Sequence, residues 1–160
     1  MRRIGLTALA LGAVLAGALG TPAAASTAAD ERVAPEIAAV METVPGGVLI
    51  DENHAVWPGL DMEMTVLPSQ SRTSARSSSS GSCPSGRICL YANRSMSGSM
   101  VSWSTCGNHS IPAGFEARAM ANARSSGYAQ ARNGTRVVAT AYAGRSTGID
   151  APTDNVRCVL

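Results

Sequence analysis

The stretch "SCPSGRICLYANRSMSGS", residues 82–99, largely decides which fold this chain can adopt. Cys83 and Cys89 enclose a Pro-Ser-Gly turn, so a disulfide between them could fix the start of a first strand. Tyr91 lies on that strand. Gly98 follows seven positions later, where the missing Cβ permits a positive φ and a close approach of the tyrosine ring. The stretch therefore predicts a strand that ends in a tight aromatic corner.

Short β-prone runs continue along the rest of the chain. "RICLYA", "MVSWS", "SGYAQA" and "TRVVATAYA" lie between turn residues, which is typical of a small antiparallel sandwich or barrel. "VVATAYAGRSTG" repeats the corner imperfectly, with Tyr142 and Gly148 one residue closer together. The Tyr-x6-Gly spacing resembles the corner of βγ-crystallin Greek keys, and a second copy fits the two Greek keys of one such domain.

Residues 1–25 have the pattern of a secretory signal peptide: two arginines, an apolar run over residues 4–19, and small residues ending in Ala23-Ala24-Ala25. The apolar run is shorter than the ~20 residues that a membrane span needs. We therefore expect a secreted, extracellular protein without a stable membrane anchor after signal removal.

The four cysteines are read as two disulfides, because thiols oxidise outside the cytosol and an even count in a short chain indicates a disulfide framework. Four cysteines allow three pairings. Cys83 and Cys89 form the one pair that is close in sequence, which leaves Cys106 with Cys158. The second bridge would close a long loop and so stabilise the fold most.

Upstream of the corner lie a serine-rich linker, residues 69–82, and an acidic segment, residues 26–68. In "ERVAPEIAAVMETVPGG" apolar residues recur at helical intervals and predict a short helix around Pro35–Thr43. "VLIDENHAVWPGLDMEMTVL" predicts a β-hairpin about Pro58-Gly59. A lone hairpin is marginally stable in water. We therefore expect it to dock on the following module, residues 83–160.

The two halves of the chain carry opposite charge. Residues 26–67 hold eight acids and one arginine, a formal charge of −7, whereas residues 68–160 hold ten arginines and three acids, a formal charge of +7. Opposite signs favour docking, although two solvated surfaces that merely differ in sign would give the same counts. Without residues 1–25 the chain is formally neutral, so nothing indicates nucleic-acid binding.

Catalytic and zinc sites are not indicated. The cysteines show no C-x2-C spacing, and His54 and His109 fit no zinc-ligand pattern. "DENH", residues 51–54, clusters two acids with a histidine but lacks H-E-x-x-H. With all cysteines paired, no thiol nucleophile remains. We interpret both histidines as satisfied surface residues and expect a non-enzymatic protein without a cofactor.

A closer resemblance rests on "CPSGRICLY…SG" together with "NARSSGYAQARNGTRVVATAYAG". These stretches resemble the secreted bacterial metalloproteinase inhibitors of βγ-crystallin-like fold, over residues 82–160. The resemblance implies an all-β protein: a single βγ-crystallin-like Greek-key sandwich of two Greek keys, preceded here by the short helix and the β-hairpin. It also implies a monomeric peptidase inhibitor whose partner is an extracellular protease, bound through a substrate-like loop.

Cys158 and Val159 are the candidate inhibitory contact, because they resemble the Val-x-Cys-Val of a reactive loop in that family. A bulky apolar residue on a pinned, exposed backbone is what thermolysin-like proteases accept after the scissile bond. The alternative is that Val156, Cys158 and Leu160 alternate as a last strand closing the sheet.

Calcium binding is a further property of crystallin-type domains, which use an (N/D)(N/D)xx(S/T)S signature of oxygen ligands. The corresponding stretches here are "ANARSS", residues 121–126, and "DNVRCV", residues 154–159. Ala121 replaces an oxygen ligand in the first, and Cys158 replaces a hydroxyl in the second. We expect no bound metal at this degenerate motif, whose remaining oxygen-bearing residues are Asn122, Ser125, Ser126, Asp154 and Asn155.

Two other functions stay open, since fold alone does not determine function. The ten arginines from Arg72 onward could contribute to binding a cell-envelope polymer. The βγ-crystallin fold also occurs in killer-toxin-like antimicrobial proteins, so the resemblance permits that function as well.

Overall fold

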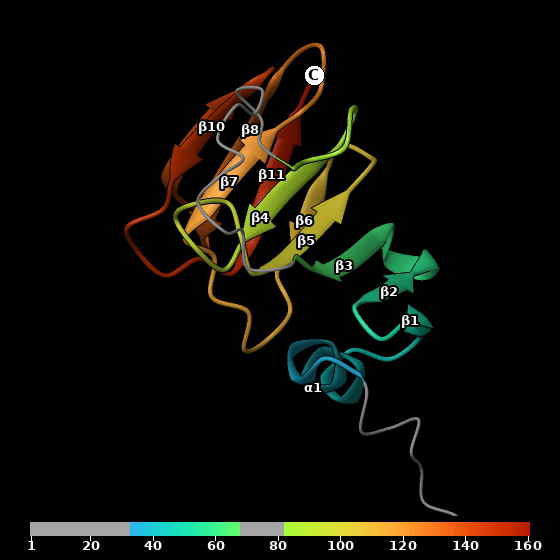
Figure 1. The fold of residues 1–160 in the computed structure, drawn as a ribbon. Coiled ribbons are helices and arrows are strands. Elements are labelled where there is room, and N and C mark those ends of the chain that lie inside the picture. Colours follow the sequence, from blue (N-terminus) through green and yellow to red (C-terminus); the bar gives the residue numbers. More distant parts are fainter. Residues whose placement is uncertain (1–32, 68–81) are drawn as a thin grey trace, which may run out of the picture.

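The computed structural model describes residues 33–67 and 82–160 (Figure 1). The expected signal peptide and, apart from Ser82, the expected serine-rich linker lie outside these residues. Within them, no helix is both long and apolar enough to cross a lipid bilayer.

The N-terminal segment, residues 33–67, forms one helix and a small meander. Helix α1 (Pro35–Thr43) has proline in its first turn and buries Ile37 and Val40, and its bounds confirm the predicted helix. The three strands that follow are β1 (Val48–Asp51), β2 (His54–Trp57) and β3 (Met62–Val66), with a 3-10 turn, η2 (Pro58–Leu60), before β3.

The prediction of a two-stranded hairpin is therefore wrong in one respect. The stretch before Pro58 forms two strands, β1 and β2, so the segment has three strands. The Asp51 carboxylate accepts a hydrogen bond from the backbone N–H of Asn53 at 2.8 Å. This closes a tight turn and lets β1 fold back on β2. The turn after β2 lies at Pro58-Gly59, as predicted.

The module from residue 82 to 160 is an antiparallel β-sandwich, which confirms the predicted all-β class. The described chain forms a seven-stranded sheet in the order β1-β2-β3-β5-β4-β7-β10 and a four-stranded sheet in the order β6-β11-β8-β9. The module's strands are β4 (Ile88–Tyr91), β5 (Ser99–Trp103), β6 (Asn108–Ser110), β7 (Ala119–Asn122), β8 (Tyr128–Asn133), β9 (Arg136–Tyr142), β10 (Arg145–Gly148) and β11 (Asn155–Val159).

The strand order divides the module into two similar halves. In the first half β7, β4 and β5 are neighbours and β6 lies in the other sheet; in the second half β11, β8 and β9 are neighbours and β10 lies in the other sheet. Each half thus has the 4-1-2-3 order of a Greek key with its third strand exchanged between the sheets. This arrangement is the pair of Greek keys that the sequence predicted.

The N-terminal segment docks on the module through β3, which confirms the predicted docking. Strand β3 pairs with β5 in antiparallel register from Met62 opposite Trp103 to Val66 opposite Ser99. Glu63 also forms an ion pair of 2.7 Å with Arg87. The pairing covers an edge of β5 that would otherwise expose unpaired backbone groups.

Two apolar clusters stabilise the fold. The larger lies between the sheets and under α1, with fully buried Trp57, Trp103, Leu90 and Val156 among its members. The smaller covers the opposite face of β4, β5 and β7 and includes Cys83, Cys89 and Tyr91. Burial raises the pKa of Tyr91, against the effect of a hydrogen bond with Ser82. Strands β4, β5 and β7 are consequently buried on both faces.

The residues of the two expected aromatic corners lie in or next to strands. Tyr91 is fully buried on β4, and Gly98 has a positive φ of 74°, with Asn93 Nδ2 2.6 Å from the position that a Cβ would take. Tyr142 is 66% exposed at the end of β9, and Gly148 is the last residue of β10. Packing of either tyrosine ring on its glycine stays a prediction.

Candidate functional site

Both predicted disulfides are present. Cys83 is bonded to Cys89, and Cys106 is bonded to Cys158 across a sequence separation of 52 residues. No cysteine of the chain is left free. The second disulfide joins the segment after β5 to β11.

The predicted inhibitory contact at Cys158 and Val159 lies in a strand and not in an exposed loop. Strand β11 is an inner strand, paired with β6 on one side and β8 on the other. The Cys158 side chain is buried, and Val159 is half-buried opposite Tyr128. The alternation of Val156 and Cys158 toward the core explains this placement, so the alternative interpretation of a last strand describes the structure.

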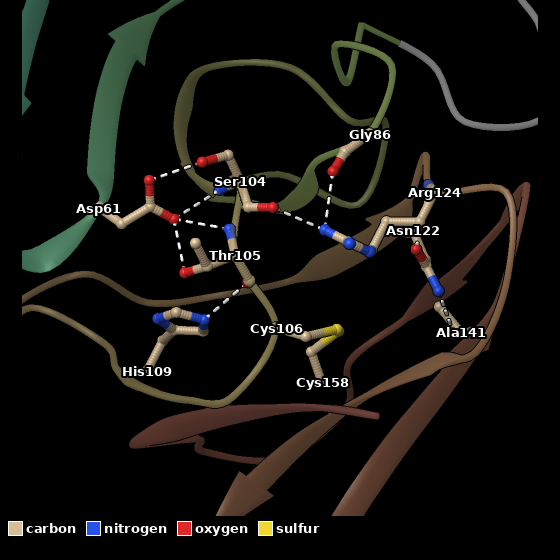
Figure 2. The surroundings of a disulfide bond; sticks show 10 residues. All are labelled: Asp61, Gly86, Ser104, Thr105, Cys106, His109, Asn122, Arg124, Ala141 and Cys158. Atoms are coloured by element: carbon tan, nitrogen blue, oxygen red, sulfur yellow. Dashed lines mark hydrogen bonds between the residues drawn. A yellow bond between two sulfur atoms is a disulfide. The ribbon is translucent and has the colours of Figure 1, made fainter. Parts of the chain in front are cut away.

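An exposed segment, Ser104–Gly107, is attached to β11 through the Cys106–Cys158 disulfide. We call this segment the pinned loop. It joins β5 to β6, and Ser104, Thr105 and Gly107 are exposed. The backbone N–H of Cys158 donates to the carbonyl of Gly107 at 2.8 Å. Figure 2 shows Cys106 of the loop next to Cys158, its disulfide partner. The disulfide and this hydrogen bond therefore attach the exposed pinned loop to the inner strand β11.

Asp61, from the N-terminal segment, holds the first half of the pinned loop. Its Oδ2 accepts hydrogen bonds from the backbone N–H of Ser104 at 2.9 Å and of Thr105 at 2.6 Å, and from the Thr105 hydroxyl at 2.7 Å. Its Oδ1 accepts the Ser104 hydroxyl at 2.6 Å. Figure 2 shows the carboxylate facing both residues. One side chain thus satisfies two backbone and two hydroxyl donors.

Two further side chains fix the loop from the module itself. Arg124 donates from Nη1 to the carbonyls of Ser104 at 2.6 Å and of Gly86 at 2.9 Å (Figure 2). His109 stacks on Trp103 with ring centroids 5.3 Å apart, and its Nε2 donates to the carbonyl of Thr105 at 3.0 Å. The loop is exposed to solvent yet held by a disulfide, a carboxylate, a guanidinium and an imidazole.

The comparisons with known proteins connect this geometry to a function. Residues 76–148 match peptidase inhibitor family I36. The match confirms the resemblance to a peptidase inhibitor family that the opening stretch predicted, and the pinned loop lies within it. We call residues 76–148 the I36 region. No curated protein and no solved structure matches the chain.

The pKa of Asp61 provides a test of the first anchor. Burial raises this pKa, but the hydrogen bonds from Ser104 and Thr105 outweigh burial and lower it from 3.8 to about 2. Because the folded state holds the proton less tightly than the unfolded state, the carboxylate stabilises the fold above pH 3.8. This stabilisation is lost as the pH falls from 3.8 toward about 2.

We expect Asp61→Asn to lower the free energy of unfolding by about 1–2 kcal/mol at neutral pH, because an amide nitrogen would face donors in a partly solvated site. Asparagine tolerates the positive φ of 48° at this position. Urea denaturation of both proteins between neutral pH and pH 2 measures the difference, which should shrink toward the acidic end. Glu52→Gln, an exposed acid of the same segment, is the control. An Asp61→Asn difference that stays constant with pH would contradict the anchor.

The degenerate calcium motif is used for internal hydrogen bonds. Buried Asn122 donates to the carbonyl of Ala141 at 3.3 Å and accepts the N–H of Arg124 at 3.2 Å. Asp154 accepts the N–H of Gly134 at 2.9 Å, and Asn155 donates to the Gly134 carbonyl at 3.0 Å. Ser125 and Ser126 are exposed. Residues 33–67 and 82–160 hold no group of three or more metal-ligating side chains, and the absence of calcium stays a prediction.

The two histidines lie in different parts of the fold. His54, on β2, contacts Glu63 of β3 at 2.9 Å, whereas His109 belongs to the support of the pinned loop. Asp61, Ser104, Thr105 and Arg124 carry no sequence motif that marks them as functional. The one signal was the position of Asp61 just beyond the predicted Pro58-Gly59 turn, and its role depends on a strand pairing that sequence alone does not specify.

Proposed function

We propose that this chain is a secreted inhibitor of extracellular metalloproteases that inserts the pinned loop into the active-site cleft in a substrate-like manner. The observation that carries this proposal is an exposed loop whose conformation is fixed by Asp61, Arg124, His109 and the disulfide. The match to peptidase inhibitor family I36 supports the inhibitory role. The resemblance to secreted metalloproteinase inhibitors makes metalloproteases the first class to test.

Rigidity is the physical basis of such inhibition. A loop already held in its bound conformation loses little conformational entropy on binding, so more of the contact energy appears as affinity. The pinned loop is held on both sides, by Asp61 at Ser104 and Thr105 and by Cys158 at Cys106. After cleavage of a bond in the loop the two ends would stay in place, which favours rejoining over release.

The predicted contact at Cys158 and Val159 enters this proposal as the support of the loop. Cys158 carries the disulfide and the N–H that binds Gly107. The half-buried Val159 is next to it at the end of β11.

Titration of the purified protein against thermolysin-like, subtilisin-like and trypsin-like proteases tests the proposal. We expect inhibition of the metalloprotease. Gly107→Gln should raise the inhibition constant by about tenfold or more, equivalent to about 1.4 kcal/mol of binding free energy. A Cβ at Gly107 meets no atom within 4 Å, so the new side chain has room at the surface where the protease must fit, while the φ of 146° also strains the substituted backbone of the loop.

Gly134→Gln is the control for an added exposed side chain, since Gly134 is also exposed and meets no atom within 4 Å at its Cβ position, with a φ of 56° that L residues adopt more readily than the 146° of Gly107. This substitution at the tip of the β8–β9 hairpin should leave inhibition unchanged. Equal effects of the two substitutions would place the contact elsewhere. Failure to inhibit any of the three proteases would refute the proposed function.

A further inference from the structure

The outer face of the four-stranded sheet is polar at its centre, with apolar side chains toward its edges. Side chains on β11 and β8 alternate: Val156, Cys158, Ala129 and Ala131 point to the core, and their neighbours point outward. We call the outward set the outer face. By strand register it consists of Asn108 and Ser110 on β6, Asn155, Arg157 and Val159 on β11, Tyr128, Gln130 and Arg132 on β8, and Val137, Thr140 and Tyr142 on β9.

The register arranges these side chains in rows across the strands. One row runs from Asn108 through Arg157 and Gln130 to Thr140. A second runs from Ser110 through Asn155 to Arg132 and ends at the exposed Val137 on β9. Neighbouring strands lie about 4.8 Å apart, so each row offers one polar group at about every 4.8 Å along a flat surface. That interval is close to the length of one sugar unit in an extended polysaccharide.

The outer face holds two arginines and no acid. Arg157 and Arg132 are diagonal neighbours, because Arg157 is opposite Gln130 and Arg132 is opposite Asn155. Among the ion pairs of the described residues, acids are paired with Arg87, Arg94 and Arg118, but none with Arg132 or Arg157. The carboxylate of Asp154, directly before β11, is engaged by Gly134. Two adjacent guanidinium groups without a counter-charge favour an anionic partner.

Two tyrosines complete the outer face beyond these rows. Tyr128 and Tyr142 are opposite each other on β8 and β9, with ring centroids 6.3 Å apart and planes inclined by 58°. Tyr142 is 66% exposed, although it is a large aromatic residue in a paired strand. An exposed ring presents an apolar surface with a polar tip, which suits the C–H face and the hydroxyl groups of a sugar.

We propose that the outer face binds an anionic polysaccharide, with Arg132 and Arg157 contacting its carboxylate or sulfate groups and Tyr142 packing against a sugar ring. The amide and hydroxyl side chains between them match the donors and acceptors of sugar hydroxyls. Nucleic acid is disfavoured, because its affinity depends on several phosphate contacts and the outer face offers two cations. A protein partner is disfavoured, because the centre of the face lacks the apolar core of a protein interface.

The test measures binding of two defined probes, a galacturonate hexamer and a heparin-derived hexasaccharide, by calorimetry at low ionic strength. A neutral galactose hexamer is the control ligand. We expect at least one acidic probe to bind and the neutral hexamer to bind at least about tenfold more weakly, because the guanidinium contacts are lost. No binding of either acidic probe at millimolar concentration would overturn the proposal, as would equal binding of the neutral hexamer.

A matched pair of variants locates the site. Arg132→Gln with Arg157→Gln should weaken binding by about tenfold or more. Arg136→Gln with Arg145→Gln removes the same charge from exposed arginines outside the face and should have little effect. Equal weakening in both would show non-specific attraction and overturn the proposal. Tyr142→Ala, at a position too exposed to affect folding, should also weaken binding, and an unchanged affinity would contradict the site. Protease inhibition should persist in all these variants, which separates this proposal from the proposed function.

Discussion

Removal of the Cys106–Cys158 disulfide by Cys106→Ala with Cys158→Ala is expected to lower the free energy of unfolding by about 4 kcal/mol. The two cysteines are separated by 52 residues, so the bridge removes much loop-closure entropy from the unfolded chain. It also joins the pinned loop to an inner strand of the four-stranded sheet. Its loss should therefore abolish inhibition as well as lower stability.

The second disulfide provides the control for this prediction. Cys83 and Cys89 are separated by 6 residues, and a loop of this length predicts a loss of about 2 kcal/mol for Cys83→Ala with Cys89→Ala. Urea denaturation of both double variants without reducing agent measures the difference. The Cys83–Cys89 variant should lose less inhibition than the Cys106–Cys158 variant, because this bridge contacts the pinned loop only indirectly, through Gly86 and Arg124. A larger loss of stability from the short bridge would contradict the argument from chain entropy.

Local sequence patterns predicted several elements correctly. The periodicity of Ile37 and Val40 and the proline in the first turn were sufficient for α1, whose bounds are Pro35–Thr43 as predicted. The cysteine pairing followed because only Cys83 and Cys89 are close in sequence. The alternation of Met62 and Met64 in β3 indicated a half-buried strand that needs a partner, and β5 is that partner. In each case the signal in the sequence lies within a few residues, even where the partner is distant.

The features that sequence did not predict depend on contacts between distant residues. Asp61 reaches Ser104 and Thr105 only because Met62 is opposite Trp103, a register set by two sheets packing together. Tyr91 and Tyr142 are both tyrosines, but Tyr91 is buried, whereas Tyr142 lies on the solvent face of β9, opposite Tyr128. The face that a strand residue occupies changes with a shift of one position. A short motif therefore cannot determine it.

The strand pairing also makes the N-terminal segment part of the support of the pinned loop. Asp61 lies directly before β3, and its carboxylate holds the pinned loop of the I36 region. Trp57, on β2, is opposite Met62 of β3 and is 1% exposed. Its Nε1 donates to the carbonyl of Val44, the residue after α1, at 2.9 Å. The indole thus connects the helix to the strands that carry Asp61. We expect the segment and the module to unfold as one unit.

Trp57→Ala tests this cooperativity. The substitution should lower the free energy of unfolding of the whole protein by about 3–5 kcal/mol, because it leaves a large cavity and an unpaired carbonyl at Val44. Hydrogen exchange of the backbone amides in β8 and β11, which belong to the sheet that does not contain β2, is the measurement. Their protection should fall by the same free energy if unfolding is global.

Leu60→Ala is the control for this prediction, because Leu60 belongs to the same segment but is 49% exposed. Its effect should stay within about 0.5 kcal/mol. Under a cooperative fold, Trp57→Ala also gives a single urea transition with an unchanged slope, since the surface exposed on unfolding stays the same. If protection in β8 and β11 is instead unaffected while β2 and β3 exchange faster, the segment unfolds independently. Asp61 would then leave the pinned loop without unfolding of the module, and inhibition would fall before the sandwich melts.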